Sequence, residues 1–160
     1  MSETHTAEVA LRQATSADRA LLLAVYGSTR ADELDQVEWA PGQREWFLEM
    51  QFDAQDHEYR RANPEGSFDV IEVDGRPAGR LYVDRRPGDL RIVDIALLPE
   101  FRGRGIGAEL VSGLQRAARE EGRIVSIHVE AHNPAARLYE RLGFMVAADL
   151  GVYRRMEWTP

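Results

Sequence analysis

The sequence predicts an α+β protein in which four helices pack on a twisted, mixed and mainly antiparallel sheet of about six to seven strands. Three observations predict this fold class. Strand-like runs rich in Val, Ile and Leu alternate with longer runs of helical periodicity. Asp74-Gly75 separates two strand-like runs, as is typical of a hairpin. Between residues 90 and 129 a strand, a helix and a strand follow one another, and this order predicts a right-handed parallel crossover.

The N-terminal part predicts one strand followed by two helices. Residues 8–13 are strand-like, and Ser16 to Asp18 offer N-caps for a helix whose apolar face begins at Leu21. A second helix is predicted over 43–61, after Pro41-Gly42.

The rest of the chain predicts a series of strands with two more helices. Strands are expected at 68–73, 77–83, 90–98, 124–129 and 152–158, and helices at 106–120 and 134–142. A turn is expected over 85–89, and Gly122 and Gly143 end the two helices. The order ends with two strands, of which only the last has predicted bounds.

Composition indicates a single domain over residues 1–160, with 44% hydrophobic and 29% charged residues. No apolar run approaches the roughly 20 residues that span a bilayer, and the start of the chain lacks a signal-peptide pattern, so a cytoplasmic location is expected. The chain has no cysteine, which excludes disulfides, a thiolate nucleophile and thiolate metal sites. A net charge of -7 argues against nucleic-acid and anionic-membrane partners and leaves amine-bearing substrates open.

A glycine-rich turn follows the strand at 90–98. Its residues are Arg102, Gly103, Arg104, Gly105, Ile106 and Gly107, and a helix begins within it. Glycines let the backbone approach a ligand, and free N–H groups at a helix start attract anions. Two arginines add charge-assisted donors, so a diphosphate is the expected guest. A dinucleotide site is an alternative, but its G-x-G-x-x-G fingerprint and parallel strand series do not match this chain.

A second motif, residues 133–144, begins with Asn133-Pro134 and contains Tyr139 and Gly143-Phe144. Together with Asp94-Ile95-Ala96-Leu97 and the glycine-rich turn, it resembles the GNAT superfamily of acyl-CoA-dependent N-acetyltransferases, mainly over residues 68–158. The resemblance implies splayed central strands that admit the cofactor's pantetheine arm. It also implies acetyl-CoA as acyl donor and transfer of acetyl to a primary amine. Because no cysteine can form an acyl-enzyme, direct attack in a ternary complex is expected.

The resemblance assigns cofactor contacts to specific positions. The diphosphate contacts are Arg102, Gly103, Arg104, Gly105, Ile106, Gly107 and Ala108. Main-chain groups of Ile95, Ala96 and Leu97 would bind pantetheine and the oxyanion, with their side chains serving only as core. Asn133 matches a cofactor-binding position and is also a natural N-cap for the next helix.

Three residues are candidates for catalysis. Tyr139 matches the family's tyrosine that faces the CoA sulfur, where a phenol can protonate the leaving thiolate. His128 and Asp94 are rival candidates for the base that deprotonates the amine. His128 is equally well interpreted as an exposed histidine with no role. If Asp94 is not the base, it would anchor its strand. His132 is interpreted as a loop residue.

Substrate selection is expected from the N-terminal helices. Phe47, Gln51, Gln55 and Tyr59 recur every four residues and are hypothesised to line the acceptor pocket. The alternative is that this stripe is solvated while Met50 and Ala54 pack inward. An acidic loop of Glu33, Asp35 and Glu38 would attract an ammonium group or be a solvated face.

The sequence also bears on other functions, on metal binding and on oligomeric state. A non-catalytic acyl-CoA-binding sensor is the main alternative, although Tyr139 argues against it. The four histidines, His5, His57, His128 and His132, have no zinc-like spacing, so no metal is expected. Homodimers are common in the superfamily, and the resemblance leaves a homodimer open here.

Overall fold

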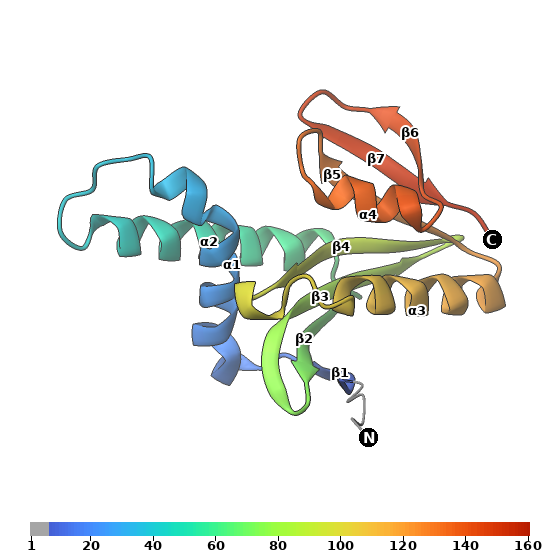
Figure 1. Cartoon of the computed structure of the whole chain (residues 1–160), viewed down its shortest axis with the longest axis horizontal. Coiled ribbons are helices and arrows are strands. Elements are labelled where there is room, and N and C mark those ends of the chain that lie inside the picture. Colours follow the sequence, from blue (N-terminus) through green and yellow to red (C-terminus); the bar gives the residue numbers. More distant parts are fainter. Residues whose placement is uncertain (1–6) are drawn as a thin grey trace, which may run out of the picture. The chain divides into compact units, whose positions relative to one another are not determined.

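The computed structural model describes residues 7–160, and these contain seven strands and four α-helices. The order is β1 (Val9–Gln13), α1 (Arg19–Leu34), α2 (Gln43–Ala62), β2 (Ser67–Val73), β3 (Arg76–Arg86), β4 (Asp89–Leu97), α3 (Ile106–Glu121), β5 (Ile124–Glu130), α4 (Ala135–Arg141), β6 (Met145–Asp149) and β7 (Tyr153–Trp158) (Figure 1). Short 3-10 turns precede α1 at Ser16–Asp18 and follow β4 at Pro99–Phe101. The predicted α+β class is confirmed.

The strands form one sheet in the order β1-β2-β3-β4-β5-β7-β6. The β1–β2, β5–β7 and β6–β7 pairs are antiparallel, and β4 and β5 are parallel, so the sheet is mixed as expected. The residues divide into two compact units. The first comprises the chain up to Leu81 together with Ile95–Arg102, and the second comprises Tyr82–Asp94 and Gly103–Pro160.

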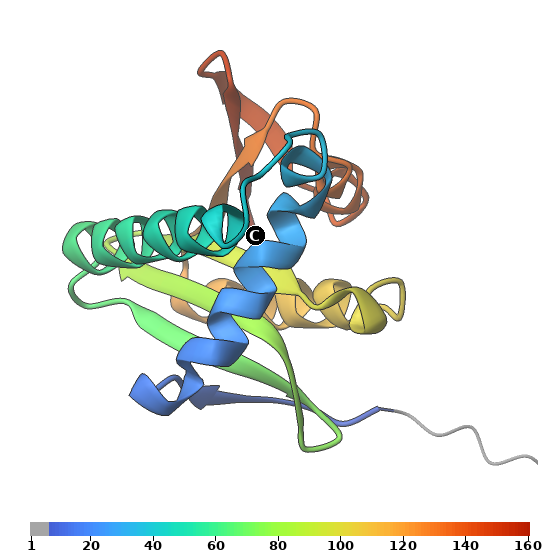
Figure 2. The same ribbon diagram turned by 90° about the vertical axis from the view of Figure 1, so that its left-hand side faces the viewer.

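In the first unit a capping box forms at the 3-10 turn that leads into α1. The side-chain oxygen of Thr15 accepts the N–H of Ala17, and the carboxylate of Asp18 accepts the N–H of Thr15. The Asp18 carboxylate also accepts two hydrogen bonds from Arg12, at 2.8 and 2.9 Å. Leu22, Tyr26 and Phe52 then form a buried cluster between α1 and α2, which cross one another in Figure 2. The cluster joins the two N-terminal helices.

In the second unit α3 packs against β5. Its buried face includes Ile106, Val111 and Ala118, at helical spacing, and α3 ends where Gly122 adopts a left-handed conformation with φ of 67°. The opposing strand residues, Leu90 and Ile92 of β4 and Val125, Ile127 and Val129 of β5, are also buried. The expected strand–helix–strand crossover is therefore confirmed.

The turn between β3 and β4 is shorter than the sequence predicts. The turn expected over 85–89 is only Pro87-Gly88, because β3 continues to Arg86 and β4 begins at Asp89. Gly88 has φ of 71°, which allows a two-residue loop to close this hairpin. The first of the two closing strands has the bounds Met145–Asp149.

Within residues 7–160, none of the helices combines the length and the apolar character needed to cross a membrane. The N-terminal stretch used in the signal-peptide prediction lies almost entirely outside the described residues.

Candidate functional site

The glycine-rich turn leads directly into the N-terminus of α3. Gly103 and Gly105 have φ of 73° and 78°, and a Cβ atom on either would meet no atom within 4 Å. Gly105 is the N-cap and provides no side-chain cap, and the carbonyl of Gly105 accepts the N–H of Glu109 at 3.0 Å. The first turn of α3 therefore has no capping side chain, and its N–H groups, contributed by Ile106, Gly107 and Ala108, are available to a ligand. Such a terminus suits an anion.

The two arginines of the turn lie in different units. In the first unit the Nε of Arg102 donates to the carbonyl of Leu97 at 3.0 Å, and its Nη2 donates to the Oγ of Ser28 at 3.1 Å. Arg102 thus ties the end of β4 to α1. Arg104 belongs to the second unit and is exposed.

The end of β4 approaches β3 very closely in the first unit. A Cβ atom on Gly79 would lie 2.1 Å from the carbonyl oxygen of Ala96. The N–H of Leu98 donates to the carbonyl of Ala78 at 2.8 Å. Ile95, Ala96 and Leu97 are only half-buried, so their side chains are not the core residues that were expected.

The parallel strands β4 and β5 pair over only part of their length. The register runs from Asp89↔Ile124 to Ile92↔Ile127. Within residues 7–160, Val93 and Asp94 of β4 do not pair with β5, whereas β5 pairs with β7 from Val125 to Glu130. The pairing thus ends before Asp94 and His128, as expected of central strands that splay, and the splay itself stays a prediction.

Tyr139 is buried in α4, with 4% of its surface exposed. Its ring lies edge-on to Phe144, with 5.7 Å between ring centroids. Burial and the negative charge of Asp94 raise the pKa of Tyr139 to about 12. The phenol therefore keeps its proton across the physiological pH range, and the charge of Asp94 is close enough to act on its hydroxyl.

Asn133 fixes the start of α4. Its Oδ1 accepts the N–H of Ala135 at 2.9 Å, and its own N–H donates to the carbonyl of Glu130 at 3.0 Å. Asn133 thus bonds to the start of α4 from the position before its N-cap, Pro134, and its cofactor-binding role stays a prediction.

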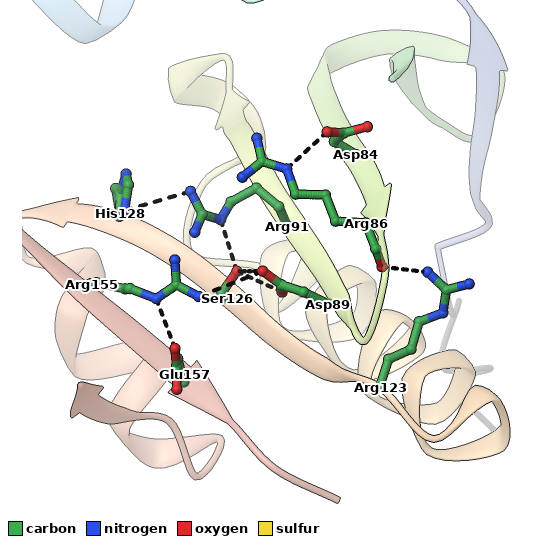
Figure 3. A network of polar contacts seen from close by, with 9 residues as sticks. All are labelled: Asp84, Arg86, Asp89, Arg91, Arg123, Ser126, His128, Arg155 and Glu157. Carbon is green, nitrogen blue, oxygen red and sulfur yellow. Dashed lines mark hydrogen bonds and ion pairs between the residues drawn. The ribbon is translucent and has the colours of Figure 1, made fainter. Parts of the chain in front are cut away.

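A polar network in the second unit has His128 at one end, where it contacts Arg91 (Figure 3). Arg91 of β4 donates through Nε to the buried hydroxyl of Ser126 at 2.8 Å, and its Nη1 lies 3.5 Å from the Nε2 of His128. His128 is itself exposed, as one reading of the sequence expected. Partial desolvation, followed by the charges of Arg91, Arg155 and Arg86, lowers the pKa of His128. Sequence reasoning missed Arg91 and Ser126. Their only signal is that polar residues alternate with apolar ones along both strands.

A cavity of about 120 Å³ lies between α1 and α2 in the first unit. Its lining residues are Tyr26, Arg30, Glu33, Leu34, Phe47, Leu48 and Gln51. Two members of the predicted stripe, Phe47 and Gln51, therefore line a cavity. Gln55 instead accepts a hydrogen bond from the buried Arg80 at 2.9 Å.

The alternative orientation of α2 is wrong, because Met50 and Ala54 are exposed. Leu48 and Phe52 pack toward the α1–α2 cluster instead. Of the acidic loop, Glu33 lines the cavity and bonds to Arg30 at 3.2 Å, while Asp35 pairs with Arg44 at 2.7 Å.

No group of three or more His, Asp or Glu residues able to hold a metal is found within residues 7–160. His5 lies outside this range.

Known proteins resemble this chain at both the sequence and structure levels. It is 30% identical over 129 residues to the mycothiol acetyltransferase of Corynebacterium aurimucosum, covering 74% of this chain and 42% of the relative. It is 33% identical over 125 residues to the mycothiol acetyltransferase of Corynebacterium glutamicum strain R, covering 76% and 41%. The chain thus spans about two-fifths of the length of these curated relatives.

The fold matches that of the PaiA N-acetyltransferase of Thermoplasma acidophilum, solved in complex with coenzyme A. The TM-score is 0.71 at 15% identity, and the match covers 96% of this chain and 99% of the other. The family model described as the acetyltransferase (GNAT) family matches residues 31–144, which include β4, the glycine-rich turn, β5 and Tyr139. The chain belongs to the GNAT acetyltransferase family.

Proposed function

We propose that this chain is an N-acetyltransferase that moves the acetyl group of acetyl-CoA directly to a primary amine in a ternary complex. The open N-terminus of α3, with left-handed glycines at 103 and 105, carries the proposal. Its N–H groups would hold the CoA diphosphate, with Arg104 adding positive charge from the same unit. Asn133 is the further cofactor contact on this unit. Ile95, Ala96, Leu97 and Arg102 remain predicted contacts of the first unit.

Tyr139 is the proposed acid. The amine nitrogen attacks the thioester carbonyl, the C–S bond breaks, and the departing thiolate takes the phenolic proton. A phenol with a pKa of about 12 is fully protonated before this step, as an acid must be. The fold of the GNAT family and the place of Tyr139 in its second motif support this role.

Asp94 is the proposed base. After burial, its charge is the second cause that raises the pKa of Tyr139, so Asp94 would take a proton from the ammonium group, directly or through water, and return it to the phenolate. This assignment leaves His128, the rival candidate, without the base role.

The testing experiment measures CoA-thiol release from acetyl-CoA with a panel of amines, amino acids and N-terminal peptides. We expect turnover with one acceptor class and a loss of kcat of about 10²–10⁴-fold in Tyr139→Phe. The matched control is Tyr153→Phe, which changes an exposed tyrosine of β7 and should leave kcat unchanged. Tight acetyl-CoA binding without turnover of any acceptor would favour the sensor function instead.

A further inference from the structure

Arg91 is held rigidly within the second unit. Only 6% of its surface is exposed, and its Nε donates to Ser126, which is fully buried. The Ser126 hydroxyl in turn donates to the carboxylate of Asp89, with oxygen distances of 2.7 and 2.8 Å. Among the described residues the Nη2 of Arg91 has no hydrogen-bond partner. The guanidinium is therefore held by Ser126, which Asp89 holds in turn, and within residues 7–160 no carboxylate bonds to it directly.

This fixed guanidinium faces one ring nitrogen of His128. Nη1 of Arg91 lies 3.5 Å from Nε2 of His128 (Figure 3). A guanidinium has donors only, so the nitrogen that faces it must present its lone pair. In a neutral imidazole the proton then resides on the other nitrogen, Nδ1.

The charges around His128 also oppose a second proton. Arg86 of β3, Arg91 of β4 and Arg155 of β7 all act against the imidazolium. Three of the four acidic groups on these strands are bonded elsewhere: Asp84 to Arg86, Asp89 to Ser126 and Arg155, and Glu157 to Arg155. The fourth, Asp94 of β4, acts on Tyr139. On the strand of His128 the remaining acidic neighbour is Glu130, which is exposed.

We propose that Arg91 is a positioning residue that fixes His128 as the neutral Nδ1–H tautomer, so that His128 donates a hydrogen bond to the acceptor and does not remove its proton. This inference rests on the proposed function and names a substrate class. An Nδ1–H donor among three guanidinium groups fits an amine whose neighbouring carbon carries a carbonyl or carboxylate oxygen. Amino acids, their amides and peptide N-termini share this chemistry, whereas simple alkylamines lack it.

The tautomer is measured without turnover, so its outcome is independent of the proposed function. Long-range proton–nitrogen NMR spectra of the histidine-labelled protein, with His128→Asn to assign the signal, should show the Nδ1–H form of His128 near neutral pH. In Arg91→Met the Nε2–H form should gain population and the pKa of His128 should rise. Ser126→Ala, which frees Arg91 from its hydrogen bond to this hydroxyl, is the second variant if Arg91→Met does not fold. A wild-type His128 in the Nε2–H form would overturn the proposal.

Kinetics test the donor role separately. The amide nitrogen of asparagine replaces Nδ1 as a donor but cannot act as a base, so His128→Asn should keep kcat. His128→Ala should raise the acceptor KM about 10-fold, as expected for one lost hydrogen bond to a polar group. The preference for glycinamide over ethylamine should fall with His128→Ala and persist with His128→Asn. If His128→Asn loses kcat as severely as His128→Ala, His128 is the base and the proposal fails. His57→Asn, an exposed histidine of α2, is the control.

Discussion

The carbonyl oxygen of Ala96 occupies the space that a side chain on Gly79 would need, at 2.1 Å from the Cβ position. Because the obstacle is backbone, it cannot rotate away as a flexible side chain can. We predict that Gly79→Ala lowers the free energy of unfolding by about 1–3 kcal/mol or prevents folding. Urea denaturation measures this. Gly113→Ala in α3 is the control, since its Cβ would meet only the end of the Arg116 side chain at 3.6 Å and should be neutral or stabilising.

Gly105→Ala should weaken acetyl-CoA binding about 10-fold or more. The added methyl group strains a residue with φ of 78° and enters the open space before the N–H groups of α3. Gly88→Ala is matched to it, with φ of 71° and equally open surroundings in the β3–β4 turn. Gly88→Ala should lose a similar amount of stability and keep the wild-type affinity for acetyl-CoA. Isothermal titration calorimetry distinguishes the two, and equal affinities in both variants would contradict an anion site at α3.

Asp94→Asn should lower the pKa of Tyr139 from about 12 toward its ordinary value of 10.0. The negative charge of Asp94 opposes phenolate formation, so its removal favours ionisation, while burial still holds the pKa above 10.0. Phenolate absorbance as a function of pH, with Tyr139→Phe subtracted to isolate this tyrosine, gives the value. A pKa that does not move would show that Asp94 is too far from the hydroxyl to exchange protons with it.

Asp18 should make the free energy of unfolding depend on pH under acidic conditions. Hydrogen bonds from Arg12 and the backbone of Thr15 lower its pKa from 3.8 to about 2. As pH falls, the unfolded state binds the proton first, so the contribution of Asp18 is complete above 3.8 and is lost as pH falls toward 2. Asp18→Asn should therefore be less stable than wild type at neutral pH, and the difference should shrink through this window. Asp53→Asn, which removes an exposed partner of Arg19, should cost much less.

Gln51→Ala should change the acceptor KM and leave the acetyl-CoA KM unchanged, because Gln51 lines the cavity between α1 and α2. Gln55→Ala should instead act on stability, since the Gln55 amide binds the buried Arg80. Steady-state kinetics with both substrates varied, together with urea denaturation, separates the two effects. Met50→Ala on the exposed side of α2 is the control. An acceptor KM that does not respond to Gln51→Ala would exclude this cavity from substrate selection.

The sequence by itself determined the element types and the family. Periodicity and turn glycines act over a few residues, so the helix at 106–120 and the strand at 124–129 were predicted to within one residue of α3 and β5. The boundary errors at 85–89 arose because hydrogen bonding between β3 and β4 extends both strands into residues that favour a turn. The same local signals marked Gly103 and Gly105, whose positive φ belongs to the turn itself.

Only the tertiary structure decided which side chains meet. Arg91 and Ser126 are far apart in sequence, and the parallel register of β4 and β5 brings them together beside His128. The approach of Ala96 to Gly79 and the outward direction of Met50 likewise depend on how strands and helices pack. Burial and neighbouring charge then raise the pKa of Tyr139 and lower that of His128. These effects depend on distances through space, and the order of residues along the chain does not contain them.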